Sequence, residues 1–207
     1  MTKNPLHYQV SEYDCGPTAV LNAMSYLFFR EALSPDLIRN IMLYCLDCFG
    51  SDGSTGKRGT SCMAMMFLSN WINGYGQVGH LPVSSEFLSQ KEVSFGEHSK
   101  IEDALRRRGA VVVRVDFDGW HYVLLTGIKK DKIYLFDPYY RKEPFSYEDI
   151  IMTEEYPTDY NRIVPIHYFE KEELGIYSLG PIETREAVIF FNKETKLTWE
   201  NTVEYVI

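Results

Sequence analysis

Apolar residues at three- and four-residue intervals mark the first structured stretch of the chain. From Gly16 onward these positions are Val20, Ala23, Met24, Leu27 and Phe28. This spacing places apolar side chains on one face of a helix, and Pro17 fits a first helical turn because an N–H there has no intrahelical partner to lose. The pattern predicts a helix that begins at or just after Cys15.

Three further helices are predicted by capping residues in front of apolar stretches. The third of these opens with the Ser-x-x-Glu spacing of a capping box, in which the serine and glutamate side chains each satisfy a backbone N–H. The predicted ranges are about 35–49, 61–74 and 100–108, with caps at Ser34, at Thr60 or Ser61, and at Ser99. The loop at 50–59 is rich in glycine; we expect it to border a cleft, and the alternative is a plain connection on the surface.

From Gly109 onward the pattern changes to short runs rich in Val, Ile, Tyr and Leu, which predict β-strands. Pro165 cannot donate to a strand ladder, so its strand is expected at a sheet edge. The predicted strands are 110–115, 121–128 and 132–137, then 163–169, 186–192 and 202–207, with hairpins joining the second to the third and the fifth to the sixth. A short helix is expected to start at 146–149.

These elements predict an α+β fold in a single domain, 1–207. Residues 1–108 form a mainly helical lobe, and residues 109–207 form a mainly β lobe whose C-terminal extension starts at about 150. That extension is expected to enlarge the β lobe, and as an alternative its many tyrosines line a surface for a partner.

The composition narrows the functional classes. With 207 residues, 45% of them hydrophobic, the chain can bury a substantial core. A net charge of −8 argues against nucleic acid and anionic membrane as partners, since both require clustered basic surface. No apolar run approaches the roughly 20 residues needed to span a bilayer, and none follows the N-terminus as a signal core. We therefore expect a cytoplasmic protein without membrane insertion.

The four cysteines, at positions 15, 45, 48 and 62, are then expected as reduced thiols. Cys45 and Cys48 have the Cys-x-x-Cys spacing of metal sites, but zinc needs about four ligands and no second pair is present. We interpret them as two thiols packed inside the predicted helix 35–49. The sequence thus implies no metal and no cofactor.

Cys15 occupies a position of a different kind. A helix N-terminus stabilises an anion, which favours the nucleophilic thiolate, although a lone cysteine is more often a small buried apolar residue. Three residues support the reactive interpretation: Gln9 precedes Cys15 by six positions, His121 begins a strand, and Asp137 ends its hairpin partner. Antiparallel pairing can place the last two side by side. Acyl transfer by a cysteine requires such a base, an orienting group and an amide donor for the oxyanion.

This ordered combination resembles the papain-like cysteine peptidases, and most closely the bacteriocin-processing branch that removes double-glycine leader peptides. The matching residues are Gln9, Asp14-Cys15-Gly16, Gly59-Thr60-Ser61, His121-Tyr122-Val123 and Asp137-Pro138. The resemblance implies a papain-like fold with the active site between the two lobes. It makes Cys15 the nucleophile, His121 the base, Asp137 the orienting group and Gln9 the oxyanion donor.

The resemblance also implies a peptide or protein substrate. In well-known members of this branch the module is joined to a membrane exporter, so a separate peptide exporter is a candidate partner. Two alternatives stay open: a hydrolase or acyl transferase acting on a small amide or ester with the same residues, and a noncatalytic peptide-binding module. Asn161 is an alternative orienting residue for His121.

Overall fold

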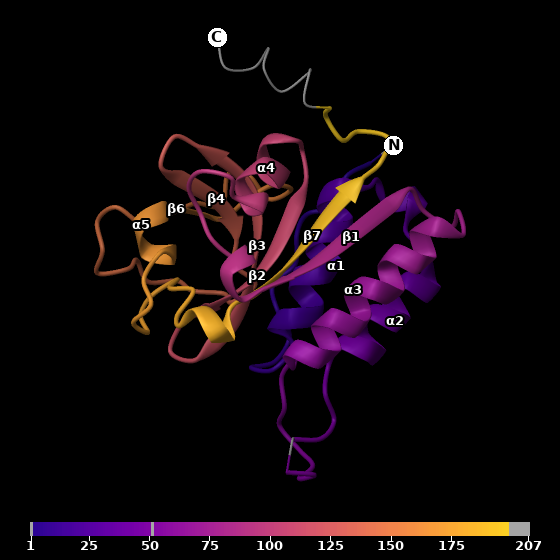
Figure 1. Ribbon diagram of the computed structural model, residues 1–207, viewed down its shortest axis with the longest axis horizontal. Helices are drawn as coiled ribbons and strands as arrows, with labels where there is room; N and C mark the ends of the chain where they lie inside the picture. Colours follow the sequence, from indigo (N-terminus) through magenta and orange to yellow (C-terminus); the bar gives the residue numbers. More distant parts are fainter. Residues whose placement is uncertain (1, 51, 199–207) are drawn as a thin grey trace.

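The computed structural model describes residues 2–50 and 52–198. The strands of this part of the chain form one antiparallel sheet. Its seven strands are ordered β1-β7-β2-β3-β4-β6-β5, and helices lie on both faces (Figure 1). The strands are β1 Val83–Ser89, β2 Ala110–Asp116, β3 Trp120–Lys129, β4 Lys132–Phe136, β5 Ile151–Met152, β6 Arg162–Pro165 and β7 Glu186–Asn192.

Three helices cover one face of this sheet. They are α1 Cys15–Leu27, α2 Pro35–Cys45 and α3 Cys62–Gln77. Apolar residues of α1, such as Val20 and Met24, pack with every second residue of the central strands, including Val112, Leu124 and Val188. Since alternate side chains of a strand point to opposite faces, this packing fixes the register of the strands.

The other face is covered by α4 Lys100–Arg106, α5 Ile166–Phe169 and the segment that leads into β7. Here the intervening strand residues, among them Val113, Val123 and Leu135, pack against Ile101 and Phe169. The central strands are therefore buried on both sides, which explains why β2 reads as an almost unbroken apolar run. Among the described residues, no helix is long and apolar enough to cross a membrane.

Two helix ends differ from the sequence prediction. Helix α2 ends at Cys45, so Cys48 lies outside it and is exposed, and the idea of two packed helical thiols is wrong. The chain leaves the helix because Asp47 pairs with the far end of the loop, its N–H donating to Gly59 O and its carboxylate accepting from Ser61 N–H. Helix α3 continues past Gly74 to Gln77. A glycine inside a helix costs only about 1 kcal/mol, which the packing of the rest of the helix can outweigh.

The capping box at Ser99 is only half formed. The Ser99 hydroxyl accepts the N–H of Glu102 at 3.1 Å, as predicted. The Glu102 carboxylate, however, accepts from the N–H of Gly96 at 2.8 Å, while Ser99 N–H donates to Gly96 O. A tight turn before the helix thus replaces the second half of the box.

The C-terminal part differs most from the prediction. Residues 163–169 divide into strand β6 and helix α5, and β6 is not the edge strand, because β5 pairs with Arg162 and Ile163. Pro165 is still compatible with its place, since within the described residues it pairs with Lys132 of β4 and not with β5. Residues 146–149 form turns rather than a helix.

Strands β7 and β1 complete the list of differences. Strand β7 pairs with β1 and β2 in the sheet. Its predicted hairpin partner, 202–207, lies outside the described residues. Strand β1 was not predicted at all. The tyrosines Tyr168 and Tyr177 of the C-terminal extension are buried in the core rather than displayed on a surface.

Candidate active site

Cys15 is the first residue of α1, and the loop before it is held by Asp14. The Asp14 carboxylate accepts the N–H groups of Val10, at 2.9 Å, and Ser11, at 2.7 Å, and makes no capping hydrogen bond to the helix. Burial alone would raise the pKa of Asp14, but the hydrogen bonds from Ser11 and Val10 outweigh it and lower that pKa. The Asp14 side chain thus does not occupy the first N–H groups of α1, and these groups favour an anion beside Cys15.

His121 and Asp137 form a buried pair at one end of the sheet. Nε2 of His121 lies 2.8 Å from Oδ1 of Asp137, and the two side chains are 8% and 1% exposed. The geometry follows from the register, in which Leu124 faces Phe136, so that Asp137, the residue directly after β4, lies diagonally across from His121. The sequence prediction that this hairpin brings the two residues together is confirmed.

His121 and Asp137 each stabilise the charged form of the other. Burial alone would lower the pKa of His121, but the Asp137 carboxylate and a hydrogen bond with Cys15 raise it above its usual value. Burial alone would raise the pKa of Asp137, yet His121 and further hydrogen-bond donors lower it. The preferred state is therefore an imidazolium held between a carboxylate and the sulfur of Cys15.

Cys15, His121 and Gln9 line one cavity of about 280 Å³, together with Phe117, Tyr139 and Trp120. The backbone of Gln9 is fixed by a hydrogen bond from its N–H to Pro138 O, at 2.9 Å, which ties the N-terminal loop to the residue after Asp137. Its side-chain Nε2 donates to Ser11 O at 2.7 Å, and Oε1 is buried with no hydrogen-bond partner among the residues that the structure describes. Since an amide nitrogen has two hydrogens, one N–H of Gln9 remains beyond the bond to Ser11.

Asp137 is held by Asn161, which the sequence analysis considered only as an alternative partner of His121, and by Tyr177, which it did not assign to the site. Asn161 binds its backbone, accepting from Asp137 N–H and donating to Asp137 O, both at 2.8 Å. Asn161 thus positions Asp137 and does not bind His121. The Tyr177 hydroxyl donates to Oδ2 of Asp137 at 2.8 Å. No local sequence pattern identifies either residue, because both reach the site only through long-range packing.

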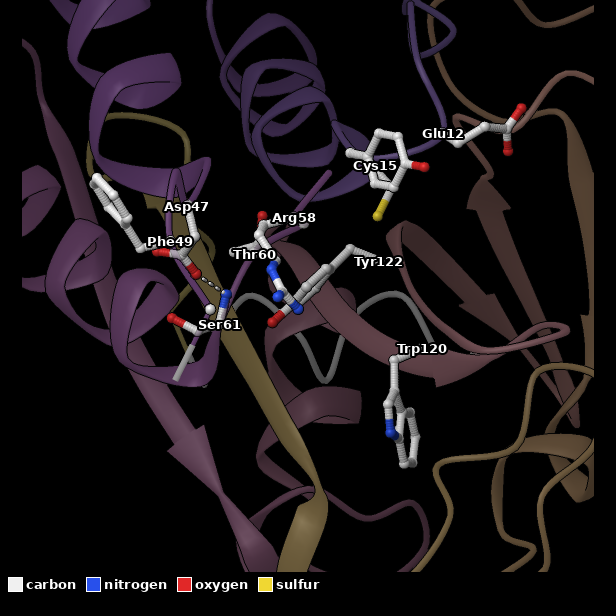
Figure 2. A pocket seen from close by; sticks show the side chains of 12 residues that line it. Glu12, Cys15, Asp47, Phe49, Arg58, Thr60, Ser61, Trp120 and Tyr122 are labelled. Carbon is white, nitrogen blue, oxygen red and sulfur yellow. Dashed lines mark hydrogen bonds between the residues drawn. The ribbon is translucent and has the colours of Figure 1, made fainter. Parts of the chain in front are cut away.

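A second cavity, of about 420 Å³, is also lined by Cys15. Figure 2 shows Cys15, Trp120 and Tyr122 toward one end of it, and Asp47, Phe49 and Ser61 toward the other. Gly50, Arg58 and Gly59 line it as well, which confirms that the loop 50–59 borders the cleft. A Cβ atom on Gly16 would lie 2.1 Å from Oγ1 of Thr60, so Thr60 packs directly on the α1 backbone beside Cys15.

The other cysteines have surroundings that favour the neutral thiol or place it away from the pair. Burial raises the pKa of Cys45 to about 12, and burial together with Glu186 raises the pKa of Cys62 to about 11. Cys48 is exposed. The buried Glu186 also accepts the hydroxyl of Tyr122, which lines the larger cavity. Cys15 and Cys62 each begin a helix, but of the four thiols Cys15 is the one that lies against the His121–Asp137 pair.

The fold and the site together define a class of protein. A helix that presents a cysteine at its N-terminus, packed on an antiparallel sheet that carries a His–Asp pair, gives an α+β papain-like architecture. The model of the Peptidase_C39 like family matches residues 1–166, and the chain accordingly belongs to that family of papain-like cysteine peptidases of the bacteriocin-processing type. No curated protein matches the chain.

Several solved structures are similar to the chain at low identity. A double glycine motif protease from an AMS/PCAT transporter, solved in complex with the leader peptide, is 14% identical, covers 91% of this chain and 92% of its own, and has a TM-score of 0.47. The peptidase domain of Streptococcus ComA is 13% identical, covers 90% of this chain and 97% of its own, and has a TM-score of 0.46. A putative C39-like peptidase from Bacillus anthracis is 15% identical, covers 90% of this chain and 93% of its own, and has a TM-score of 0.49.

Proposed function

We propose that the chain hydrolyses a peptide bond with Cys15 as nucleophile, His121 as acid and base, Asp137 as orienting group and Gln9 as oxyanion donor. The observation that carries this proposal is the buried 2.8 Å contact between Asp137 and His121, a residue that lines one cavity together with Cys15. With Nε2 directed at Asp137, the remaining nitrogen, Nδ1, is the one available to the sulfur. The carboxylate thereby selects the tautomer and the ring orientation that proton transfer needs.

The reaction proceeds in two steps. The Cys15 thiolate attacks the carbonyl carbon, the carbonyl electron pair moves onto oxygen, and the imidazolium of His121 then gives its proton to the departing amine. A thioester remains on Cys15. Water attacks this thioester while His121 takes one of its protons, and the carboxylic acid product leaves as the thiolate is restored.

Gln9 is assigned to the oxyanion because its side chain lines the cavity of Cys15 and retains one N–H beyond its bond to Ser11. Loss of one such donor costs about 2.7–4 kcal/mol in the barrier. Gln9→Ala should thus lower kcat by a factor on the order of 10² to 10³ and leave KM nearly unchanged. Steady-state kinetics on a fluorogenic peptide measure both. A change confined to KM would contradict the role.

We further propose that the substrate is a leader peptide cut after two glycines. The support is the family membership and the position of Thr60, which packs beside Cys15 while Trp120 lines both cavities next to it. The cavity of about 420 Å³ has room for several residues of an extended peptide. The restriction to glycine then applies only where the peptide passes Cys15, because a side chain there would move the scissile carbonyl out of reach.

A peptide library varied at the two positions before the cut tests this specificity. We expect efficient cleavage with glycine or another very small residue at both positions, and loss of turnover when the second glycine becomes valine. Cys15→Ala is the control that abolishes cleavage throughout. Efficient cleavage after large side chains would remove the double-glycine assignment and leave the peptidase.

The setting of the reaction completes the proposal. All four cysteines are free thiols, which fits the reducing cytoplasm. A leader peptidase there acts before export, so a separate peptide exporter is the partner that we propose. The association can be tested by co-purification: when a substrate that carries a leader peptide is present, the chain and the exporter should purify together.

A further inference from the structure

Tyr177 connects the C-terminal part of the chain to the proposed catalytic carboxylate. It lies beyond residues 1–166, which the family model matches, and its side chain is fully buried. We propose that Tyr177 is a positioning residue that holds the Asp137 carboxylate in the orientation that His121 requires. This inference rests on the proposed function, because it assigns a role within the same site.

The two oxygens of Asp137 have separate partners. Oδ1 faces Nε2 of His121 at 2.8 Å and also accepts the N–H of Tyr139 at 2.9 Å. Oδ2 accepts the hydroxyl of Tyr177 at 2.8 Å. A carboxylate group can rotate about its bond to Cβ, and that rotation would take Oδ1 away from the imidazole. A donor fixed on Oδ2 prevents it.

Tyr177 is itself held rigidly. Its N–H donates to Asp116 O at 2.9 Å, and Asp116 N–H donates to Ser178 O at 2.8 Å, so the segment is pinned to the end of β2. Its φ of 57° lies in the left-handed region, which a bulky residue adopts only where the surroundings enforce it. The ring packs among the rings of Phe117, Phe145 and Phe169. Such strain at a site next to catalytic groups is typical of residues that orient them.

The Tyr177 hydroxyl also keeps its proton over the working range of pH. Burial, and then the negative charge of Asp137, raise the pKa of Tyr177 well above its usual value. It therefore donates to the carboxylate wherever the His121–Asp137 pair is charged. Tyr177 therefore does not act as a pH-dependent switch.

The test is Tyr177→Phe in the full chain, which keeps the ring and removes only the hydroxyl. The matched control is Tyr168→Phe, since Tyr168 is also buried in this part of the core and donates to a carboxylate outside the site, Asp149 Oδ1, at 2.7 Å. Two quantities are measured for each variant: kcat and KM for the peptide substrate, and the rate at which limiting iodoacetamide alkylates Cys15 as a function of pH.

We expect Tyr177→Phe to lower kcat on the order of tenfold with little change in KM, because one hydrogen bond to a charged group is lost. A displaced carboxylate stabilises the imidazolium less, and the imidazolium in turn stabilises the thiolate less. The midpoint of Cys15 alkylation should thus rise by about half a pH unit. Tyr168→Phe should leave both quantities unchanged. In an Asp137→Ala background, Tyr177→Phe should have almost no further effect on kcat, since the group it positions is gone.

An unchanged kcat and an unchanged alkylation midpoint in Tyr177→Phe would overturn the role of Tyr177, and so would equal losses in Tyr168→Phe or an undiminished effect in the Asp137→Ala background. Failure of the proposed function has a separate signature: Cys15 of the wild-type chain would be alkylated at about pH 6 no faster than the exposed Cys48. That result refutes the activated nucleophile and, with it, the positioning role.

Discussion

A buried carboxylate such as Asp137 is stable only if its charge is compensated. Desolvation of an ionised group costs several kcal/mol unless hydrogen bonds and an opposite charge replace water. Around Asp137 these come from His121, the Tyr139 N–H and Tyr177. At the scale of single residues, the site is thus a connected network in which each group sets the charge of the next.

Replacing Asp137 by asparagine tests this network through pH. Because the carboxylate raises the pKa of His121, the alkaline limb of kcat/KM in the wild-type chain should lie above the ordinary histidine value of about 6.5. In Asp137→Asn that limb should move down, and kcat should fall by at least about tenfold. An alkaline limb that stays in place would assign the raised pKa of His121 to a group other than Asp137.

The same shifts predict how stability depends on pH. The raised pKa of His121 contributes stability that is fully present below about pH 6.5 and is lost as pH rises through its folded-state pKa. The lowered pKa of Asp137 contributes stability above about pH 3.9 that is lost as pH falls through its folded-state value. Between about pH 4 and 6.5 both contributions are present, so the deficit of Asp137→Asn in urea unfolding should be largest there. A deficit that does not vary with pH would show that the pair adds no linked stability.

At the scale of elements, the sequence predicts best what local chemistry decides. The starts of α1, α2 and α3 follow from Pro17, Ser34 and Ser61, and the hairpin β3–β4 follows from its apolar runs and polar turn. Cys15, His121 and Asp137 are found for the same reason, since each lies at the end of a predictable element. Gln9 is found only through its spacing from Cys15, because no regular element carries it.

What the sequence misses depends on contacts between distant segments. The strand β1 contains Ser84, Ser85 and Glu86, a composition that does not predict a strand, and it forms because β7 pairs with all of it and α3 packs on it. Tyr177 is missed because nothing near it in sequence distinguishes it from the other tyrosines. Long-range packing overrides local preference at these places.

The contact between α3 and β1 can be tested with two glycines of the same helix. A Cβ atom on Gly76 would lie 1.9 Å from the carbonyl oxygen of Val83, a backbone atom that cannot rotate away. Gly76→Ala should thus lower the free energy of unfolding by about 1–3 kcal/mol. Gly74 has nothing within 4 Å of its Cβ position, so Gly74→Ala should raise it by up to about 1 kcal/mol. Urea unfolding of both variants gives the comparison, and a Gly76→Ala chain as stable as the wild type would mean that the helix and strand separate easily.

At the scale of the whole molecule, the C-terminal part is structural core. Strand β7 lies between β1 and β2, and all seven of its residues are buried. It joins β1 to the rest of a sheet whose other strands come from residues 83–165. The segment that leads into β7 supplies Tyr177 to the site. The fold therefore depends on residues outside the region matched by the family model.

A fragment that ends at residue 166 measures this dependence. Without β7, the strand β1 loses the one strand that pairs with it in the described part of the chain, and β2 loses one of its two neighbours there. Their N–H and C=O groups and the side chains packed on Val188 and Phe190 then meet water. A domain is stable by only about 5–15 kcal/mol, and burial of a single large apolar side chain accounts for about 1.5–3 kcal/mol. We expect the fragment to lack a cooperative urea transition and the near-ultraviolet circular dichroism of the full chain, and to lose activity with them. A fragment that unfolds cooperatively and cleaves peptide would show that residues 1–166 form a self-sufficient peptidase and that β7 is an accessory strand.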